Sequence, residues 1–533
     1  MNQSPRITGA ALIGATERLG NSTFKAVNPA TGEVLSSFHE SDAADVAAAC
    51  ALADEAFLHF SELPPAERAH FLETIAEEIV ALGDALVLRA VAETALPRAR
   101  IESERGRTTG QLRFFAGILR EGAWLDATVD PAQPDRVPQP RPDLRRRNVG
   151  LGPVAVFGAS NFPLAFSVAG GDSAAALAAG CPVVVKGHPA HAGTGELVAR
   201  AVRSAAQLCG LPAGVFSYLP GTSHALGGAL VAHPQIQAVG FTGSRAGGQA
   251  LMRIAAARPQ PIPVYAEMSS INPVFLFPAA AHARGADLGR AYVGSLTLGA
   301  GQFCTNPGLL IAVADDGLDA FLAAAVAALG QTAAQTMLTA DISARYAQGV
   351  RTLEAHAGVE SLARGLPPES DNRGRAALFS TRLEGFVNSP LLGAEVFGAS
   401  SLIVRAASTD EFVRAATQLE GQLTATVLFD TADEPAVAGL LPSLARRVGR
   451  IIGNGWPTGV EVAHAMVHGG PYPATSDGRS TSVGALAIER FLRPVCYQNL
   501  PDTLLPPALR SDNPWHLPLR VDGVPVTDGG KIT

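Results

Sequence analysis

A chain of 533 residues is too long for a single hydrophobic core, so we expect two or three domains. Hydrophobic residues make up 47% of the chain and charged residues 17%, which is typical of a compact globular protein and excludes a disordered or fibrous one. The net charge of -7 argues against nucleic acid and anionic membranes as partners.

The five cysteines are scattered and lack the spacing of a zinc site or a disulfide framework. A reducing cytoplasm fits this pattern best. The N-terminal residues contain no charged segment that leads into an apolar run, so we expect no secretory signal. Two apolar stretches, at 151–171 and 292–313, are interrupted by Gly and Pro, and a globular core explains them better than a membrane span. We expect no metal site.

The N-terminal part is predicted to be mainly helical. A short strand, an Asn-Pro turn and the start of a second strand are predicted at 24–33, before an Ala-rich segment at 42–60 where apolar residues recur at helical spacing. Long helices are predicted at 66–92 and 97–122. The Pro-rich segment at 131–144 cannot be helical and is expected to be an exposed connection.

Strands and helices alternate from residue 149 onward. Four apolar runs, each followed by a helical segment, read as strands at 152–160, 181–189, 215–221 and 236–244. This alternation predicts a parallel sheet of the doubly wound type. A second α/β block is expected from 276 to about 475, and the last segment has strand potential and a Pro-rich tail.

Residues 299–308, with the sequence GAGQFCTNPG, surround Cys304 with turn-forming residues. This composition predicts a turn that presents the sulfur at its tip. A thiol needs access to substrate and a route to the thiolate before it can act as a nucleophile. The alternative is a structural cysteine, because most free cysteines behave as small core hydrophobes.

Several polar residues stand where predicted strands end. Asn161 could donate its side-chain amide to a developing negative charge, or it could simply stabilise a turn. Lys186 ends the second strand, at the sheet edge where ligands bind; a surface lysine is the alternative. Gly243, Ser244 and Gly248 could open a helix against a pyrophosphate, although a tight turn explains them equally well.

Two carboxylates lie in apolar surroundings. Glu267, in VYAEMSS, is expected to be buried with a raised pKa or to face a cleft. A raised pKa would suit a base that takes a proton from water or a thiol near neutral pH. Glu395 precedes a Phe-Gly turn in GAEVFGAS. An ion-paired structural glutamate is the alternative.

The motifs GASNFP, VVVKGHP, FTGS, YAEMSS, GQFC and EVFG stand in the order found in the aldehyde dehydrogenase superfamily, which the chain resembles from residue 27 to residue 501. The resemblance implies that Cys304 is the nucleophile that attacks an aldehyde carbon. It also implies that Asn161 and the backbone N–H of Cys304 hold the oxyanion, and that Glu267 activates the water that hydrolyses the thioester.

The same resemblance implies a dinucleotide cofactor. Lys186 would contact the adenosine ribose, Ser244 the pyrophosphate and Glu395 the nicotinamide ribose. Many NAD-preferring members carry a glutamate where this chain has Pro189, so Lys186 and His188 could accommodate an adenosine 2′-phosphate. We therefore expect NADP, with NAD as the alternative. Further cofactor contacts are expected from Gly243, Gly248 and Phe397.

Within the superfamily, Pro189, the SNFP motif and the RPVCYQN tail resemble most the branch with α-ketoglutaric semialdehyde (2,5-dioxopentanoate) dehydrogenases and some long-chain aldehyde dehydrogenases. The first of these substrates carries a carboxylate that needs a cationic or amide partner at the tunnel mouth. Arg113 and Arg120 share one predicted helix face and could line that mouth, with a solvated basic face as the alternative. Other pocket residues are expected to be Phe114, Phe303 and Thr305.

Other functions were compared with this one. A broad or long-chain aliphatic aldehyde dehydrogenase would have an apolar tunnel without a carboxylate anchor. A CoA-acylating enzyme would not need Glu267 as a base for water. A non-redox cysteine hydrolase would need a histidine beside Cys304, and sequence spacing places none of His188, His464 and His468 there. A catalytically silent homologue is disfavoured because the candidate catalytic residues are all present.

The implied architecture is α/β, with a Rossmann-type cofactor domain, an α/β catalytic domain and a small oligomerisation arm. We expect a homo-oligomer, either a dimer or a tetramer. The predicted boundaries are 1–128 and 146–275 for the cofactor domain, 276–475 for the catalytic domain, and 129–145 and 476–533 for the arm.

Overall fold

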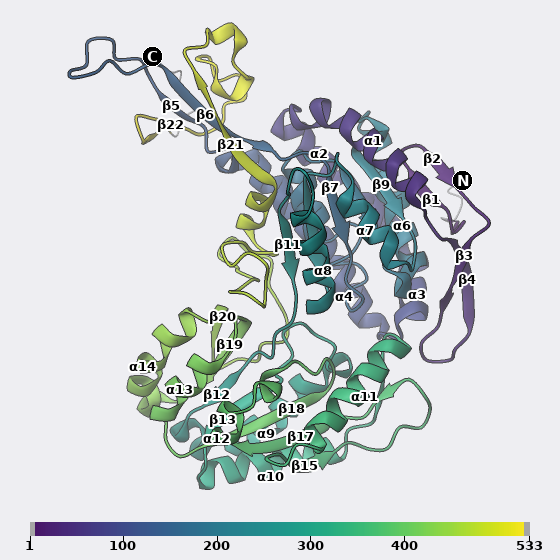
Figure 1. Cartoon of the computed structure of the whole chain (residues 1–533), viewed down its shortest axis with the longest axis vertical. Coiled ribbons are helices and arrows are strands. Elements are labelled where there is room, and N and C mark those ends of the chain that lie inside the picture. The colour runs from purple at the N-terminus through teal and green to yellow at the C-terminus, as the bar shows by residue number, and fades with distance from the viewer. Residues whose placement is uncertain (1–5, 527–533) are drawn as a thin grey trace.

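The computed structural model describes residues 6–526. Two seven-stranded sheets covered by helices form the upper and lower bodies in Figure 1, and a five-stranded sheet projects from the upper one. This arrangement confirms the predicted α/β class. No helix within the described residues is long and apolar enough to span a bilayer. The exact domain boundaries stay predictions.

The first sheet has the strand order β11-β10-β7-β8-β9-β1-β2. Its first five strands are parallel, and β1 runs antiparallel to both of its neighbours. The four apolar runs predicted from the sequence are β7 to β10. The strands are β1 (Ala11–Ile13), β2 (Thr16–Arg18), β7 (Val154–Phe157), β8 (Val183–Lys186), β9 (Phe216–Leu219), β10 (Ala238–Thr242) and β11 (Val264–Glu267).

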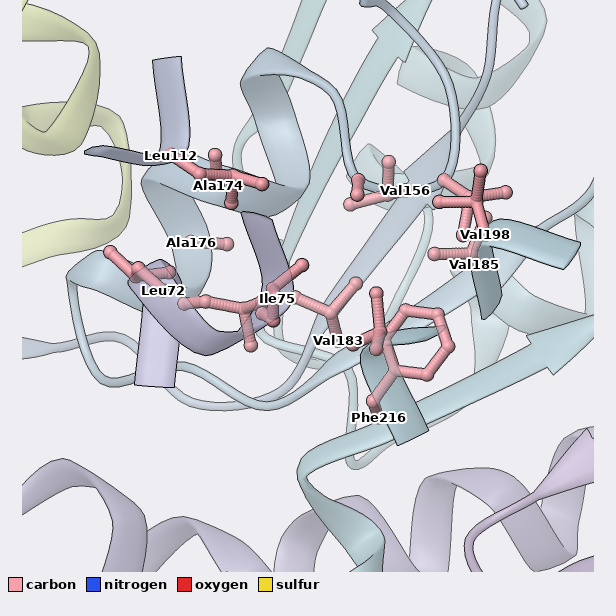
Figure 2. Packing of buried hydrophobic residues seen from close by; sticks show 14 of the residues in the cluster. Leu72, Ile75, Leu112, Val156, Ala174, Ala176, Val183, Val185, Val198 and Phe216 are labelled. Atoms are coloured by element: carbon pink, nitrogen blue, oxygen red, sulfur yellow. The ribbon is translucent and has the colours of Figure 1, made fainter. Parts of the chain in front are cut away.

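Helices cover both faces of this sheet. Val183 and Val185 pack in one core cluster with α2, α4 and α6, whereas Val184 between them packs in another with α1, α7 and α8. Figure 2 shows part of the first cluster, in which Ile75 of α2 lies beside Val183. The helices are α1 (Ala43–Ser61), α2 (Pro65–Ala81), α3 (Gly83–Thr94), α4 (Arg98–Glu121), α5 (Gly171–Ala178), α6 (Ala192–Leu208), α7 (His224–Ala232) and α8 (Arg245–Ala256).

The predicted helix at 66–92 is divided into α2 and α3. Gly83 has a φ of +55°, a left-handed conformation that an uninterrupted α-helix does not contain. The prediction of one long helix was therefore wrong at this point, because the apolar spacing continues across the break. The strand–turn–strand pattern at 24–33 is confirmed as the hairpin of β3 (Thr23–Val27) and β4 (Val34–His39).

The second sheet has the order β15-β17-β18-β13-β12-β19-β20, in which all neighbours are parallel except β15 and β17. Its strands are β12 (Val274–Leu276), β13 (Leu309–Val313), β15 (Glu360–Arg364), β17 (Ala377–Arg382), β18 (Ser400–Ala406), β19 (Gln422–Leu428) and β20 (Val448–Gly453). Its helices are α9 (Pro278–Thr297), α10 (Asp316–Gly330), α11 (Ala340–Glu354), α12 (Leu383–Val387), α13 (Asp410–Gln418) and α14 (Glu434–Ala445). A short pair, β14 (Gln335–Thr336) and β16 (Arg373–Gly374), lies beside it.

The projecting sheet joins segments that are far apart in the sequence, in the order β21-β6-β5-β22-β23 (Figure 1). Arg145, Arg146 and Arg147 of β6 each form an ion pair with a carboxylate from another segment of the chain. The Arg145 and Arg147 side chains are largely buried, whereas that of Arg146 stays 43% exposed. The strands are β5 (Thr128–Asp130), β6 (Leu144–Gly150), β21 (Leu492–Gln498), β22 (Leu519–Val521) and β23 (Val524–Val526).

Candidate active site

Three reactive side chains from distant parts of the chain meet between the two large sheets. Glu267 is the last residue of β11 in the first sheet, Cys304 lies on the loop between α9 and β13, and His468 follows β20. The Cys304 sulfur, a ring nitrogen of His468 and a carboxylate oxygen of Glu267 all lie within 4.8 Å of one another. The site is therefore made by both bodies of the molecule.

The Cys304 loop has a fixed and unusual backbone. Residues 299–301 all have positive φ, and a Cβ on Gly301 would lie only 2.3 Å from backbone atoms of a neighbouring loop, so glycine is required there. Asn272 Nδ2 donates hydrogen bonds to the carbonyls of Cys304 at 2.8 Å and Asn306 at 2.9 Å. The predicted turn is present, and its sulfur is half-buried and directed at Glu267.

Asn161 lies against the same loop. Its Nδ2 atom donates a 2.9 Å hydrogen bond to the carbonyl of Gln302, two residues before Cys304. The side chain is 9% exposed and sits on the loop that follows β7. Because an amide nitrogen carries two hydrogens, one N–H stays available to an oxygen bound near the sulfur.

Glu267 is buried and held by two partners. One carboxylate oxygen lies 2.9 Å from Nε2 of His468, and the other accepts a 2.8 Å hydrogen bond from the Ser482 hydroxyl. Burial by itself raises the pKa of Glu267, but the His468 ring and the hydrogen bonds from His468, Ser482 and Cys304 outweigh it and lower this pKa. The expected raised pKa was wrong, because the sequence did not reveal these partners.

The Cys304 thiol has the opposite shift. Burial, and next the charge of the neighbouring Glu267 carboxylate, raise the pKa of Cys304 well above its ordinary value. The resting thiol is therefore protonated at neutral pH and needs a base when it attacks. Glu267 and His468 are the bases within reach.

His468 was missed by the sequence reasoning. Its Nε2 atom lies 3.5 Å from the Cys304 sulfur, so the expectation that no histidine stands beside this cysteine was wrong. The ring is buried, and the backbone N–H of His468 donates to Thr481 Oγ1 at 2.8 Å. In the sequence, His468 is marked only by the Gly-Gly pair that follows it. It is 164 residues from Cys304, so no local periodicity could connect the two residues.

Comparison with known proteins decides the family. The family model described as the aldehyde dehydrogenase family matches residues 16–487. The chain belongs to the aldehyde dehydrogenase family. An aldehyde dehydrogenase accounts for a cysteine, a carboxylate and an amide at one point, because its reaction needs a nucleophile, a base and an oxyanion donor.

Two similar curated relatives cover nearly the whole of this aldehyde dehydrogenase. α-Ketoglutaric semialdehyde dehydrogenase 2 of Azospirillum brasilense is 56% identical over 521 residues, 97% of this chain and 99% of that protein. α-Ketoglutaric semialdehyde dehydrogenase of Acinetobacter baylyi is 47% identical over 491 residues, 91% and 92% of the two chains. The solved structure of aldehyde dehydrogenase C from Pseudomonas syringae, with a TM-score of 0.79, 22% identity and coverage of 92% and 96%, shows the same fold.

The sheet edge that carries Lys186 and Ser244 offers unused polar groups. Lys186 ends β8, is half-buried, and forms no hydrogen bond or ion pair with residues 6–526, while burial lowers its pKa to about 8. Ser244 caps α8 by accepting a hydrogen bond from Gly247 N–H at 3.2 Å. Burial raises the pKa of Glu395 to about 8, and among residues 6–526 its carboxylate accepts a single hydrogen bond, of 3.5 Å, from Ser270 N–H. These groups fit a ligand with phosphates and ribose hydroxyls.

The two glycines near Ser244 have structural contacts of their own. Gly243 N–H donates a 3.1 Å hydrogen bond to the carbonyl of Glu267, which ties the strand-to-helix turn to β11. A Cβ on Gly248 would lie 2.7 Å from the sulfur of Met268, so glycine lets α8 approach the segment after β11. Gly248 therefore has a packing reason that is independent of any ligand.

His188 is held by local contacts. Its Nδ1 atom accepts a hydrogen bond from Ala190 N–H at 3.2 Å, and its ring stacks on His191. Burial, and next the charges of His191 and Lys186, lower the pKa of His188 well below its ordinary value, so the ring is neutral. A contact of His188 with a 2′-phosphate stays a prediction, in which this ring acts as a neutral hydrogen-bond donor. Phe397 lines a cavity together with Glu395.

The arginines predicted to line the tunnel face elsewhere. Arg120 forms two hydrogen bonds of 2.6 Å with the carboxylate of Glu73 on α2. Arg113 is exposed, and its charge contributes to lowering the pKa of the same carboxylate. Neither contacts the groups around Cys304, so their predicted placement was wrong. Phe114 does turn toward the later part of the chain, with its ring 4.9 Å from that of His464.

The neighbours of Cys304 in sequence form one aromatic wall. The Phe303 ring lies edge-on to that of Phe162 at 5.4 Å, and the Arg100 guanidinium covers Phe303 at 4.7 Å. Thr305 is 1% exposed and points into the protein rather than toward solvent.

Proposed function

We propose that this aldehyde dehydrogenase oxidises 2,5-dioxopentanoate to 2-oxoglutarate with NADP, or NAD, as the electron acceptor. The observation that supports this substrate is the likeness, over nearly the whole chain, to two α-ketoglutaric semialdehyde dehydrogenases. We also propose that the enzyme is a cytoplasmic homo-oligomer, a dimer or a tetramer, as the resemblance of the sequence implies.

In the first half-reaction Cys304 attacks the aldehyde carbon. One of the two bases that lie against the sulfur, Glu267 or His468, takes the thiol proton. The resulting oxyanion accepts hydrogen bonds from the free N–H of Asn161 and from the backbone N–H of Cys304. These bonds stabilise the developing negative charge and so lower the barrier to the attack. Lys186, Ser244 and Glu395 would hold the dinucleotide, whose nicotinamide supplies the hydride acceptor that turns the adduct into a thioester.

In the second half-reaction Glu267 takes a proton from water, and this water attacks the thioester carbon. The carbon–sulfur bond breaks, the acid leaves, and the leaving thiolate regains a proton from Glu267 or His468, which restores the Cys304 thiol. The lowered pKa of Glu267 keeps the carboxylate ionised at neutral pH, so it can accept this proton. His468 and Ser482 fix its orientation during both steps.

The cofactor preference is proposed from one departure in the sequence. Pro189 stands where many NAD-preferring members have a glutamate, so no carboxylate repels an adenosine 2′-phosphate there. Lys186 supplies the positive charge, because a pKa of about 8 leaves it largely protonated at neutral pH. His188, being neutral, can contribute only a hydrogen bond.

A panel of aldehydes measured with both nucleotides tests the proposed function. We expect kcat/KM for 2,5-dioxopentanoate to exceed that for hexanal and longer aldehydes by about 100-fold, and NADP to be used better than NAD. Formation of reduced cofactor is followed by absorbance. A reaction without nucleotide is included because the Cys304–His468 contact would also suit a cysteine hydrolase. Preference for hexanal contradicts the proposed substrate, and preference for NAD contradicts the proposed cofactor.

The replacement His468→Gln should change the pH dependence of kcat. The ring is the main group that lowers the pKa of Glu267 against the effect of burial, so this pKa should rise in the variant. The base is active only when ionised, so the acidic limb of the pH profile should move to higher pH, with kcat reduced about tenfold at pH 6. His282→Gln, on the exposed side of α9, is the matched control. An unchanged acidic limb would show that His468 does not act on Glu267.

A further inference from the structure

One guanidinium beside the active site has no anion to balance it. Arg107, on α4, uses only its Nε atom, which donates to the carbonyl of Val460 at 3.3 Å. Its two terminal nitrogens are buried and have no hydrogen-bond partner among residues 6–526, and it forms no ion pair there. Leaving a buried charged donor without a partner is unfavourable, so the site is suited to an anion from outside the chain.

Arg107 faces the reactive groups. Its guanidinium lies 4.9 Å over the ring of Phe166, and that ring is 6.1 Å from the ring of His468, which contacts Cys304. The carboxylates and thiol that act electrostatically on Arg107 include Cys304 and Glu267. A continuous line of contacts therefore connects the free nitrogens to the sulfur.

The carboxylate nearest to Arg107 is already occupied. Glu104 accepts backbone hydrogen bonds from Leu164 at 2.9 Å and Ala165 at 3.0 Å, and its other oxygen lies 3.5 Å from Arg100. Neither oxygen of Glu104 forms a hydrogen bond or an ion pair with Arg107. Glu104 thus stabilises the loop after β7 through these backbone hydrogen bonds.

The other cations of this region are satisfied. Arg100 is paired with Glu104, and the terminal nitrogens of Arg450 donate to the carbonyls of Pro457 and Gly459. Arg100, Arg107 and Phe114 are seven residues apart in turn, so they share the face of α4 that looks toward the site. Among these cations, only Arg107 has both terminal nitrogens free.

We propose that Arg107 binds the carboxylate of the semialdehyde while the aldehyde carbon lies at the Cys304 sulfur, an inference that rests on the proposed function. A guanidinium fork binds a carboxylate through two parallel N–H···O bonds, or one carboxylate oxygen together with the adjacent 2-oxo group. In 2,5-dioxopentanoate four carbon–carbon bonds separate the aldehyde carbon from the carboxylate carbon, roughly 5 Å when extended. The proposal requires that the Arg107 fork and the Cys304 sulfur engage the two ends of a molecule of this length.

The test compares two aldehydes of the same chain length, 2,5-dioxopentanoate and pentanal, in the full-length enzyme. Arg107→Met should raise KM for 2,5-dioxopentanoate by about 100-fold and change kcat/KM for pentanal by less than about threefold. Arg107→Lys, which keeps the charge but loses the fork, should fall between wild type and Arg107→Met. Arg113→Met, on the same helix but turned to α2, should leave KM and kcat/KM unchanged for both substrates.

The outcomes separate this inference from the proposed function. A wild-type enzyme that does not prefer 2,5-dioxopentanoate to pentanal contradicts the proposed function. A wild type with that preference, retained in Arg107→Met, contradicts the role of Arg107, and so does an equal loss on both aldehydes.

A binding measurement without nucleotide covers the case in which Arg107→Met does not fold. In wild type, 2-oxoglutarate should protect Cys304 from alkylation by iodoacetamide at a concentration about 100-fold below that of the uncharged 2-pentanone. Arg107→Lys should weaken protection by 2-oxoglutarate and leave that by 2-pentanone unchanged. Equal protection by the two compounds in wild type would overturn the assignment.

Discussion

Replacing Cys304 with alanine is expected to reduce aldehyde oxidation by at least about 10⁴-fold, because no other side chain at the site can form the thioester. Reduced cofactor is measured by absorbance over long incubations. Nucleotide binding, measured by fluorescence titration, should be retained, since the groups proposed to hold the cofactor lie at the ends of β8 and β10 and near Glu395. The alanine also removes a buried thiol without adding volume, so the fold should persist.

The control for this prediction is Cys496→Ala, which removes an exposed thiol from β21. It should retain wild-type turnover. Oxidation that survives Cys304→Ala would mean that the thioester mechanism does not apply to this enzyme. Loss of nucleotide binding in the same variant would show that the loop supports the cofactor site as well.

The second large effect is expected from Glu267→Gln. Hydrolysis of the thioester should slow by about 100-fold to 1,000-fold, because the amide cannot take a proton from water. Thioester formation should be less affected, since His468 still contacts the sulfur. A rapid burst of reduced cofactor, equal to the enzyme concentration and followed by slow turnover, is therefore the expected trace in a stopped-flow measurement.

The same variant makes a prediction about pH. The Glu267 carboxylate is, after burial, the largest cause of the raised pKa of Cys304. Removal of its charge should lower this pKa, so alkylation of the thiol by iodoacetamide should become faster at a given pH below the wild-type pKa. Glu384→Gln, an exposed change on α12, is the control. Full turnover in Glu267→Gln, or an alkylation profile displaced to higher pH, would contradict the proposed role.

The fold was accessible from the sequence because its signals are local. Runs such as the three valines of β8 are apolar without alternation, which occurs in parallel strands covered on both faces, and Val183, Val184 and Val185 do face two separate cores. Asn161, Lys186 and Ser244 were identified for the same reason, because each stands at or just after the end of such a run. Glycine at 301 was predicted as part of a turn, and the close approach of a second loop explains why no side chain fits there.

Contacts between distant segments were not accessible in this way. Helical spacing predicted α4 correctly and placed Arg113 and Arg120 on one of its faces, but this face is turned to α2. Arg100 and Arg107 are also seven residues apart on α4. Only the position of α2, which the sequence does not reveal, shows which of the two faces lies toward the active site. His468 and Ser482 are brought to Glu267 by the path of the chain after β20, which leaves no periodic trace.

The placement of Glu267 and Cys304 on different bodies has a mechanical consequence. Glu267 ends strand β11 of the first sheet, whereas Cys304 lies on the loop before strand β13 of the second, and each sheet is held by its own ladder of hydrogen bonds. A small separation of the two bodies would lengthen the path of proton transfer before any strand is lost. Catalysis is thus a more sensitive reporter of how the bodies are joined than the secondary structure of either one.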